Sequence, residues 1–134
     1  MGRIGWFQIV VGAGILLLWP VLILAGEVPE LEAGQRDILF HIAAEAVTGV
    51  LLVVGGVLLL RGGAAGARMV SAFALGALLY TGINSAGYYA ELGEWLPAAL
   101  LVGVAVVAAV AVAVLLRSPA PEVERIAARA RPPA

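Results

Sequence analysis

Residues 96–116 read LPAALLVGVAVVAAVAVAVLL, a run of twenty-one residues with no charged side chain. A helix of about 20 mainly apolar residues is long enough to cross the hydrocarbon core of a bilayer. Three further segments have this character, at residues 6–25, 38–60 and 69–89. The sequence therefore predicts an all-α integral membrane protein, a bundle of four transmembrane helices within a single domain over residues 1–116.

The composition of the whole chain agrees with this prediction. Of its 134 residues, 63% are hydrophobic and 13% are charged, whereas a soluble domain has about 45–50% apolar and about 25% charged residues. These values exclude a soluble domain, a disordered chain and a nucleic-acid-binding protein with a basic face. The chain has no cysteine and one histidine, so we expect no disulfide, no metal site and no cofactor.

The arginines predict how the chain lies in the membrane. Cytoplasmic loops of membrane proteins carry an excess of Lys and Arg. If both termini are cytoplasmic, only Arg36 lies outside, and seven arginines lie inside: Arg3, Arg61, Arg68, Arg117, Arg125, Arg129 and Arg131. Arginine is the only basic residue type apart from the single histidine, and Ala, Gly and Val are abundant. This composition is typical of a GC-rich bacterial genome, and we expect the protein in a bacterial inner membrane.

Two further expectations concern the ends of the chain. The first apolar run, of about 20 residues, is longer than the apolar region of a signal peptide, so we expect the first span to remain uncleaved. Residues 117–134 form a polar tail with proline near both ends. We expect this tail to be cytoplasmic and flexible.

One acidic residue lies well inside a predicted span. Glu45 is in the second span, where an ionisable side chain is costly and indicates a functional site. His41 lies four residues earlier and Asp37 four residues before that, so the three share one helix face. Thr48 extends this face one turn deeper. The second span therefore carries a polar line that descends from the outer surface.

The outer half of the third span is also polar. Residues 80–89 read YTGINSAGYY. Three side chains spaced by four share one face: Tyr80, Asn84 and Tyr88. Thr81 and Ser85 form an adjacent stripe. Because antiparallel neighbours joined by a short loop pack side by side, we expect His41 and Glu45 to face the first set.

Three interpretations of this polar cluster are open, and one of them is a contact to a partner subunit. A carboxyl beside an imidazole can relay a proton, hold a cation or anchor an amine or hydroxyl, with Arg36 and Asp37 at the entrance. Alternatively, the polar side chains only hold the helices together, at about 0.6–2 kcal/mol for each interhelical hydrogen bond.

Three functional hypotheses follow. The first is binding or transport of a small solute at Glu45, with a homodimer needed for a transport pathway because four helices make a thin wall. The second is a non-catalytic accessory subunit of a larger membrane complex. The third is a membrane enzyme that uses Glu45 and His41 as an acid–base pair on a lipid. In each case the lipid bilayer surrounds the chain, and we expect no nucleic-acid partner.

In outline the chain resembles the small multidrug-resistance transporters, which have four short helices and a buried glutamate with tyrosines. It departs from them in one respect, because their glutamate lies in the first helix and residues 6–25 contain no acid. The layout is also similar to that of DoxX-type four-helix membrane proteins. Neither resemblance includes a motif that assigns site residues.

Overall fold

A computed structural model of the chain describes residues 1–62 and 65–118. This part of the chain forms five helices: α1 (Gly2–Ala25), α2 (Pro29–Glu32), α3 (Asp37–Leu60), α4 (Ala65–Glu91) and α5 (Trp95–Arg117). The four long helices are each long and apolar enough to cross a membrane. They confirm the predicted fold class, and each lies within a few residues of its predicted span. The tail that we predicted to be flexible starts at residue 117, and its residues after Ser118 lie outside the described part of the chain.

The helices begin and end where the sequence changes character. In lipid every backbone polar group has to be bonded within the structure, and a helix does this over a whole apolar segment. Helix α1 runs through Pro20 and ends at Ala25, and it is capped by Gly26, whose φ of 73° lies in the left-handed region that suits glycine. The short helix α2 was not predicted and lies in the acidic connection between α1 and α3.

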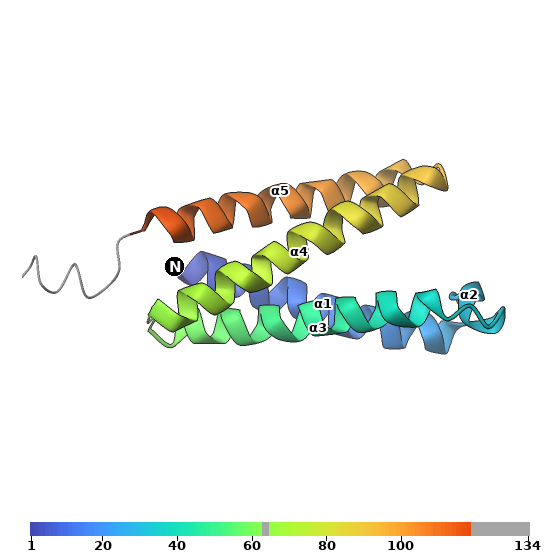
Figure 1. The fold of residues 1–134 in the computed structure, drawn as a ribbon, viewed down its shortest axis with the longest axis horizontal. Coiled ribbons are helices and arrows are strands. Elements are labelled where there is room, and N and C mark those ends of the chain that lie inside the picture. The colour runs from blue at the N-terminus through green and yellow to red at the C-terminus, as the bar shows by residue number, and fades with distance from the viewer. Residues whose placement is uncertain (63–64, 119–134) are drawn as a thin grey trace, which may run out of the picture.

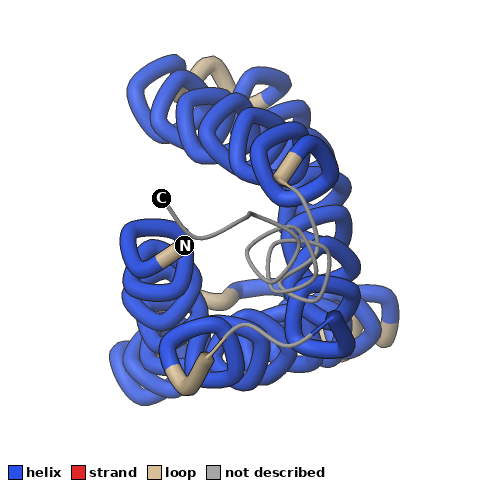
Figure 2. Tube along the Cα trace, turned by 90° about the vertical axis from the view of Figure 1, so that its left-hand side faces the viewer, coloured by secondary structure: helices blue, strands red, loops and turns tan. Residues whose placement is uncertain are grey.

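The four long helices form two antiparallel pairs. Helix α1 packs along α3, α4 packs along α5, and the contact between α3 and α4 joins the two pairs. Figure 1 shows α4 crossing from the side of α3 at one end of the molecule to the side of α5 at the other. Viewed along the helices, the backbone traces of α1 and α5 lie apart from each other (Figure 2).

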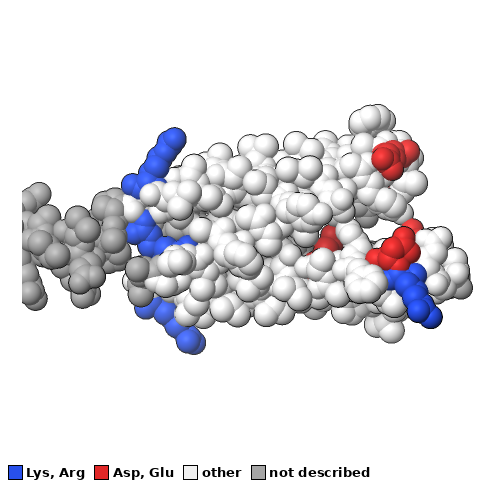
Figure 3. All heavy atoms as spheres, viewed as in Figure 1, with Lys and Arg blue, Asp and Glu red and all other residues white. Residues whose placement is uncertain are grey.

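The two ends of the bundle differ in charge (Figure 3). We call one the arginine end, where α1 begins and α5 finishes; it carries Arg3, Arg61, Arg68 and Arg117. The opposite one, the acidic end, holds α2 together with Glu27, Glu30, Asp37, Glu91 and Glu94, and also Arg36. At the arginine end, Arg68 of α4 donates hydrogen bonds to the carbonyls of Leu115 and Ser118, at the C-terminal end of α5. A cation is favourable there because carbonyls at a helix C-terminus lack intrahelical partners.

Glycines bring α1 and α3 into close contact. A Cβ atom added at Gly12 would lie 2.6 Å from the carbonyl oxygen of Gly49, and one at Gly56 would lie 2.5 Å from that of Gly5. The two glycines on each helix are seven residues apart, so both contacts lie on one face of each helix. Close backbone approach at small residues is a common way for membrane helices to associate.

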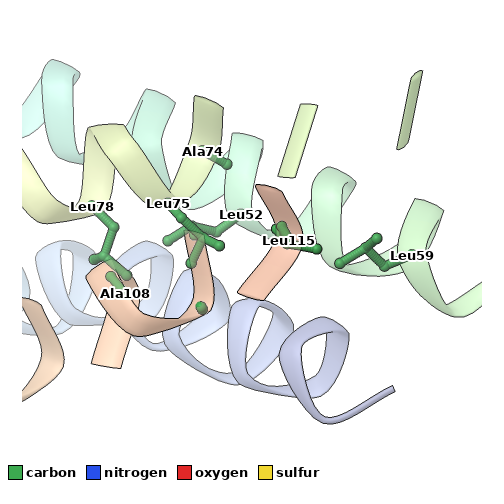
Figure 4. Packing of buried hydrophobic residues seen from close by; sticks show 8 residues of the cluster. Leu52, Leu59, Ala74, Leu75, Leu78, Ala108 and Leu115 are labelled. Atoms are coloured by element: carbon green, nitrogen blue, oxygen red, sulfur yellow. The ribbon is translucent and has the colours of Figure 1, made fainter. Parts of the chain in front are cut away.

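The apolar core lies in the half of the bundle toward the arginine end. Figure 4 shows its cluster of buried side chains from three helices: Leu52 and Leu59 of α3, Ala74, Leu75 and Leu78 of α4, and Ala108, Ala111 and Leu115 of α5. Helix α1 packs Phe7 and Val11 against this cluster. Beyond the core, toward the acidic end, α3 and α4 diverge (Figure 1).

A buried polar network lies beside the core. The side-chain amide of Gln8 donates to the carbonyl of Ser71 at 3.0 Å, and the Ser71 hydroxyl contacts Gln8 Oε1 at 3.1 Å and the Gly55 carbonyl at 2.9 Å. Both side chains are fully buried. The network links α1, α3 and α4, and its polar atoms are satisfied, which avoids the cost of an unpaired buried group.

Candidate functional site

Glu45 lies where α1, α3 and α4 meet, on the acidic side of the core. It is eight residues after the start of α3 at Asp37, which is about 12 Å along the helix axis. Its side chain is 13% exposed. Trp19 and Ser85 each lie six residues before the end of their helix, about 9 Å along its axis. Three helices therefore bring polar side chains to a similar depth.

Both carboxyl oxygens of Glu45 accept hydrogen bonds. The indole N–H of Trp19 donates to Oε2 at 2.7 Å, and the Ser85 hydroxyl donates to Oε1 at 3.0 Å. The donors come from opposite sides of α3, one from α1 and one from α4. Glu45 thus connects the two helix pairs in the half of the bundle where α3 and α4 diverge.

His41 completes the cluster from the next turn of α3. Its Nε2 lies 3.3 Å from Glu45 Oε1, and its side chain is 31% exposed. Its ring also meets the Trp19 ring edge-on, with 5.8 Å between the ring centres. The sequence spacing of four predicted this juxtaposition of His41 and Glu45. His41 is therefore the more accessible member of the pair, on the side toward the acidic end.

The hydrogen bond from α4 to Glu45 does not come from the stripe of Tyr80, Asn84 and Tyr88 that we expected to face it. The described hydrogen bond comes from Ser85, whereas Tyr80 and Asn84 are exposed. Neighbouring residues of a helix point about 100° apart, so the two polar stripes of α4 cannot both face Glu45, and the rotation of the helix decides which one does. The buried positions Ser71, Leu75, Leu78 and Gly82 continue into Ser85 with helical spacing. This periodicity is the signal that could have identified Ser85.

Tyr88 forms a second bridge between the helix pairs, nearer the acidic end. Its hydroxyl donates to Glu30 Oε1 at 2.8 Å, and the tyrosine side chain is 48% exposed. Hydrogen bonds from the Glu30 backbone N–H and from Tyr88 hold the pKa of the Glu30 carboxyl below its usual range. Tyr88 thus lies one turn above Ser85 and bonds to α2, not to Glu45.

The remaining predicted residues lie around the cluster without a described bond to it. Asp37 and Arg36 are exposed at the start of α3, on the acidic end. Thr48 is buried, and its hydroxyl donates to the Ala44 carbonyl of its own helix at 2.8 Å. Thr48 therefore belongs to the predicted polar line by its position in the sequence, and its described hydrogen bond is made within α3.

Two contributions from α1 were missed by the sequence reasoning. Trp19 was not among the residues predicted for the site, and it is a hydrogen-bond donor to Glu45. Gln8 was not singled out in the sequence either, and it is bonded within the buried network. Trp19 follows Gly12 by seven residues, as Gly12 follows Gly5. This repeat could have indicated that Trp19 lies on the face of α1 that meets α3.

The cluster offers one carboxylate, one imidazole and two neutral donors. Over residues 1–62 and 65–118, no group of three or more His, Cys, Asp or Glu side chains is placed to hold a metal ion. Such a set can stabilise a proton or a positively charged group through Glu45, and it can orient that group through His41.

Comparison with known proteins places the chain in a family. Residues 2–128 match the family described as Domain of unknown function (DUF8058). The chain belongs to this family. No curated protein and no solved structure matches the chain. Because the family description assigns no activity, the functional argument depends on the Glu45 cluster.

Proposed function

We propose that this membrane protein binds a small solute at Glu45 and carries it through the membrane as part of an oligomer. One observation carries the proposal: a carboxyl only 13% exposed collects side chains from three helices within the apolar part of the bundle. An ionisable side chain at membrane depth is costly. A chain that places a carboxyl there, with donors from Trp19 and Ser85 on both of its oxygens, has a use for that group beyond helix packing.

Helix association alone does not require this carboxyl. The core side chains and the Gln8–Ser71 network already join the helices toward the arginine end, and glycine contacts join α1 to α3. Uncharged side chains could supply a further interhelical hydrogen bond at a smaller desolvation cost. Glu45 lies instead where the helices diverge, beside the partly exposed His41. This position suits a site that a solute enters from the acidic end.

The orientation and the oligomer are parts of the same proposal. The arginine end faces the cytoplasm of a bacterial cell, and both termini lie on that side, as the positive-inside rule favours. A solute would then enter from the outer side, past Asp37 and Arg36. Four helices make a thin wall for a pathway, and α1 and α5 are not among the helix pairs with the most contacts between them. A second copy of this chain would complete that wall.

The accessory-subunit hypothesis is the second candidate, and the surface of α1 is compatible with it. Helix α1 directs large apolar side chains away from the bundle, with Val10 66%, Leu17 67% and Leu24 88% exposed. A larger membrane protein could cover this face. Under this hypothesis Glu45 stabilises the fold, and its replacement by glutamine leaves assembly of the complex intact.

Native mass spectrometry of the protein, extracted gently from its own membrane, tests the proposal. Wild type is compared with Glu45→Gln and with Glu91→Gln, a matched change of an exposed acid at the acidic end. We expect a small co-purifying mass in wild type and Glu91→Gln, and its loss in Glu45→Gln. A second variant, Ser85→Ala, keeps the carboxyl of Glu45 and should retain the mass with weaker occupancy.

The other outcomes are equally informative. A mass that persists in Glu45→Gln, or no small mass in any sample, contradicts solute binding at Glu45. A partner protein retained in all samples supports the accessory-subunit hypothesis. Because the glutamine variant replaces one accepting oxygen with an NH₂ group, its folding is checked by thermal unfolding before it is compared.

A further inference from the structure

We propose that the outward side of α4 binds a second copy of this chain, with Tyr80 and Asn84 of both copies at the centre of the contact. The contact is separate from the site at Glu45, so it does not rest on solute binding there. It follows from two polar side chains that α4 turns away from the bundle and from the symmetry of a contact between identical chains.

The outward side of α4 lies opposite the side that packs in the bundle. Ser71, Leu75 and Gly82 are buried on the packed side. Exposed residues that recur every three or four positions share the other side. We call these six residues the α4 outer face: Phe73, Gly76, Tyr80, Ile83, Asn84 and Gly87.

Two polar side chains of the α4 outer face lack a partner at membrane depth. Asn84 lies seven residues before the end of α4 at Glu91, about 10 Å along the axis, and Tyr80 lies eleven residues before it, about 16 Å. Tyr80 is 73% exposed, and Asn84 is exposed as well. Within residues 1–62 and 65–118, neither side chain has a hydrogen-bond partner. A polar group without a partner is costly in lipid, so a partner from outside the chain is favoured.

The outward sides of α1 and α5 differ from the α4 outer face. At membrane depth they present aliphatic side chains such as Leu17 of α1 and Leu100 and Val106 of α5. Lipid tails cover side chains of this kind without leaving a polar atom unpaired. Helix α4 is also the least apolar of the four candidate spans. These differences favour α4 as the helix that meets another protein surface.

The chemistry of the α4 outer face suits a second copy of the same chain. Two copies with the same orientation in the membrane are related by a twofold axis, which brings the same residues of each α4 together. A charged residue there would meet its own like charge, and none of the six residues is charged. An amide and a hydroxyl each donate and accept hydrogen bonds. Asn84 and Tyr80 can therefore each bond to their counterparts, and an asparagine between parallel helices fixes their register.

Two glycines of the α4 outer face allow a close approach. A Cβ atom added at Gly76 or Gly87 would meet no atom within 4 Å, whereas one at Gly12 would lie 2.6 Å from a backbone oxygen. Packing within one chain therefore does not require Gly76 or Gly87, although glycine is a poor helix former. Glycines at a contact between membrane helices let the two backbones come close together. Gly76 precedes Tyr80 by one turn, and Gly87 follows Asn84 by nearly one turn, so they flank the polar pair.

Disulfide cross-linking in the native membrane tests which helix meets the second copy. The chain has no native cysteine, and single cysteines replace Phe73 or Ile83 on the α4 outer face. The controls are Leu17→Cys on α1 and Val106→Cys on α5, which change residues of similar exposure. On oxidation with copper phenanthroline, we expect a dimer of this chain for at least one α4 variant and none for the controls. Equal cross-linking of the controls, a cross-link to a different protein, or no dimer from either α4 variant overturns the proposal.

Substitution of Asn84 tests the amide at the contact. Dimerisation in phosphatidylcholine vesicles is measured by energy transfer between fluorophores attached to Ser118→Cys. We expect Asn84→Leu to raise the dissociation constant about 3- to 30-fold, equivalent to about 0.6–2 kcal/mol for one interhelical hydrogen bond. Asn84→Gln keeps an amide and should dimerise more tightly than Asn84→Leu. Equal dissociation constants in wild type and Asn84→Leu would overturn the pairing of the amides.

Thermal unfolding of the monomer in dilute detergent separates this contact from a role within one chain. Because Asn84 is exposed in a single copy, the monomer of Asn84→Leu should unfold at the same temperature as wild type. A lower unfolding temperature would assign the amide to the fold of one chain and overturn the proposal.

Discussion

The indole N–H of Trp19 donates to Oε2 of Glu45 at 2.7 Å, across 26 positions of the chain. This bond fixes the carboxyl against α1, while Ser85 holds its other oxygen from α4. The carboxyl of Glu45 is thereby oriented by both neighbouring helices, and the exposed edge of His41 lies beside it.

Replacing Trp19 by phenylalanine tests the orientation of Glu45. The substitution keeps a ring against His41 and removes the donor to Oε2. We expect a loss of about 0.6–2 kcal/mol in stability, the range for interhelical hydrogen bonds in membrane proteins. Trp6→Phe is the matched control, because Trp6 is 61% exposed. Unfolding in detergent measures both; equal losses in the two variants would contradict the role of Trp19.

Gly12→Ala tests the close contact between α1 and α3. The added Cβ would lie 2.6 Å from a backbone oxygen of Gly49, so the helices have to separate. We expect a destabilisation of about 1–3 kcal/mol, typical of overpacking. Gly14→Ala, on the same helix, places its Cβ in open space and should be neutral or slightly stabilising. Thermal unfolding of the two variants checks the difference, and an unaffected Gly12→Ala protein would refute the contact.

Gln8→Leu tests the buried network beside the core. Leucine is similar in size but cannot bond to Ser71, which leaves the Ser71 carbonyl without the amide donor. We expect about 0.6–2 kcal/mol of destabilisation, the range for an interhelical hydrogen bond in membrane proteins, because Ser71 keeps its bond to the Gly55 carbonyl. Asn84→Leu changes an exposed amide and is expected to be close to wild type. A stable Gln8→Leu protein would show that the network contributes little.

Tyr88→Phe tests the bridge from α4 to α2 through its effect on acid titration. The backbone hydrogen bond of Glu30 is the larger cause of its lowered pKa, and the Tyr88 hydroxyl is the second. The pKa of Glu30 should therefore rise in the variant and still remain below its usual range. Carboxyl ¹³C NMR, with Glu30→Gln used to assign the signal, measures this change.

The lowered pKa of Glu30 also determines how its contribution to the stability of the folded protein depends on pH. A carboxyl whose pKa is lower in the folded state contributes stability above its unfolded pKa. The contribution is lost as the pH falls through the folded pKa. Wild type and Tyr88→Phe should therefore differ more near neutral pH than in acid. An identical Glu30 titration in the two proteins would exclude the bridge.

Single cysteines test the orientation in the membrane, because the chain has no native cysteine. Ser118→Cys reports on the arginine end and Glu94→Cys on the acidic end. In intact cells we expect a membrane-impermeant maleimide to label Glu94→Cys and to leave Ser118→Cys unlabelled, in accordance with the positive-inside rule. After cell lysis both should react. The reverse pattern would place the termini outside the cytoplasm.

The amino-acid sequence by itself determined the four spans and the pairing of His41 with Glu45. Span position follows from the length of each apolar run, since a bilayer requires about 20 apolar residues. The pairing follows from a spacing of four on one helix. Both depend on local sequence only, and the observed helices and the 3.3 Å contact agree with them.

Only the tertiary structure decided which side chains from other helices reach Glu45. Helix α4 carries two polar stripes side by side, and its rotation about its own axis selects Ser85 over Asn84. That rotation is set by the packing of Ser71, Leu75 and Gly82 against neighbouring helices. The glycine contacts of α1 likewise set the register that brings Trp19 level with Glu45. Rotation and register depend on how whole helix surfaces fit together, and a local sequence pattern does not specify them.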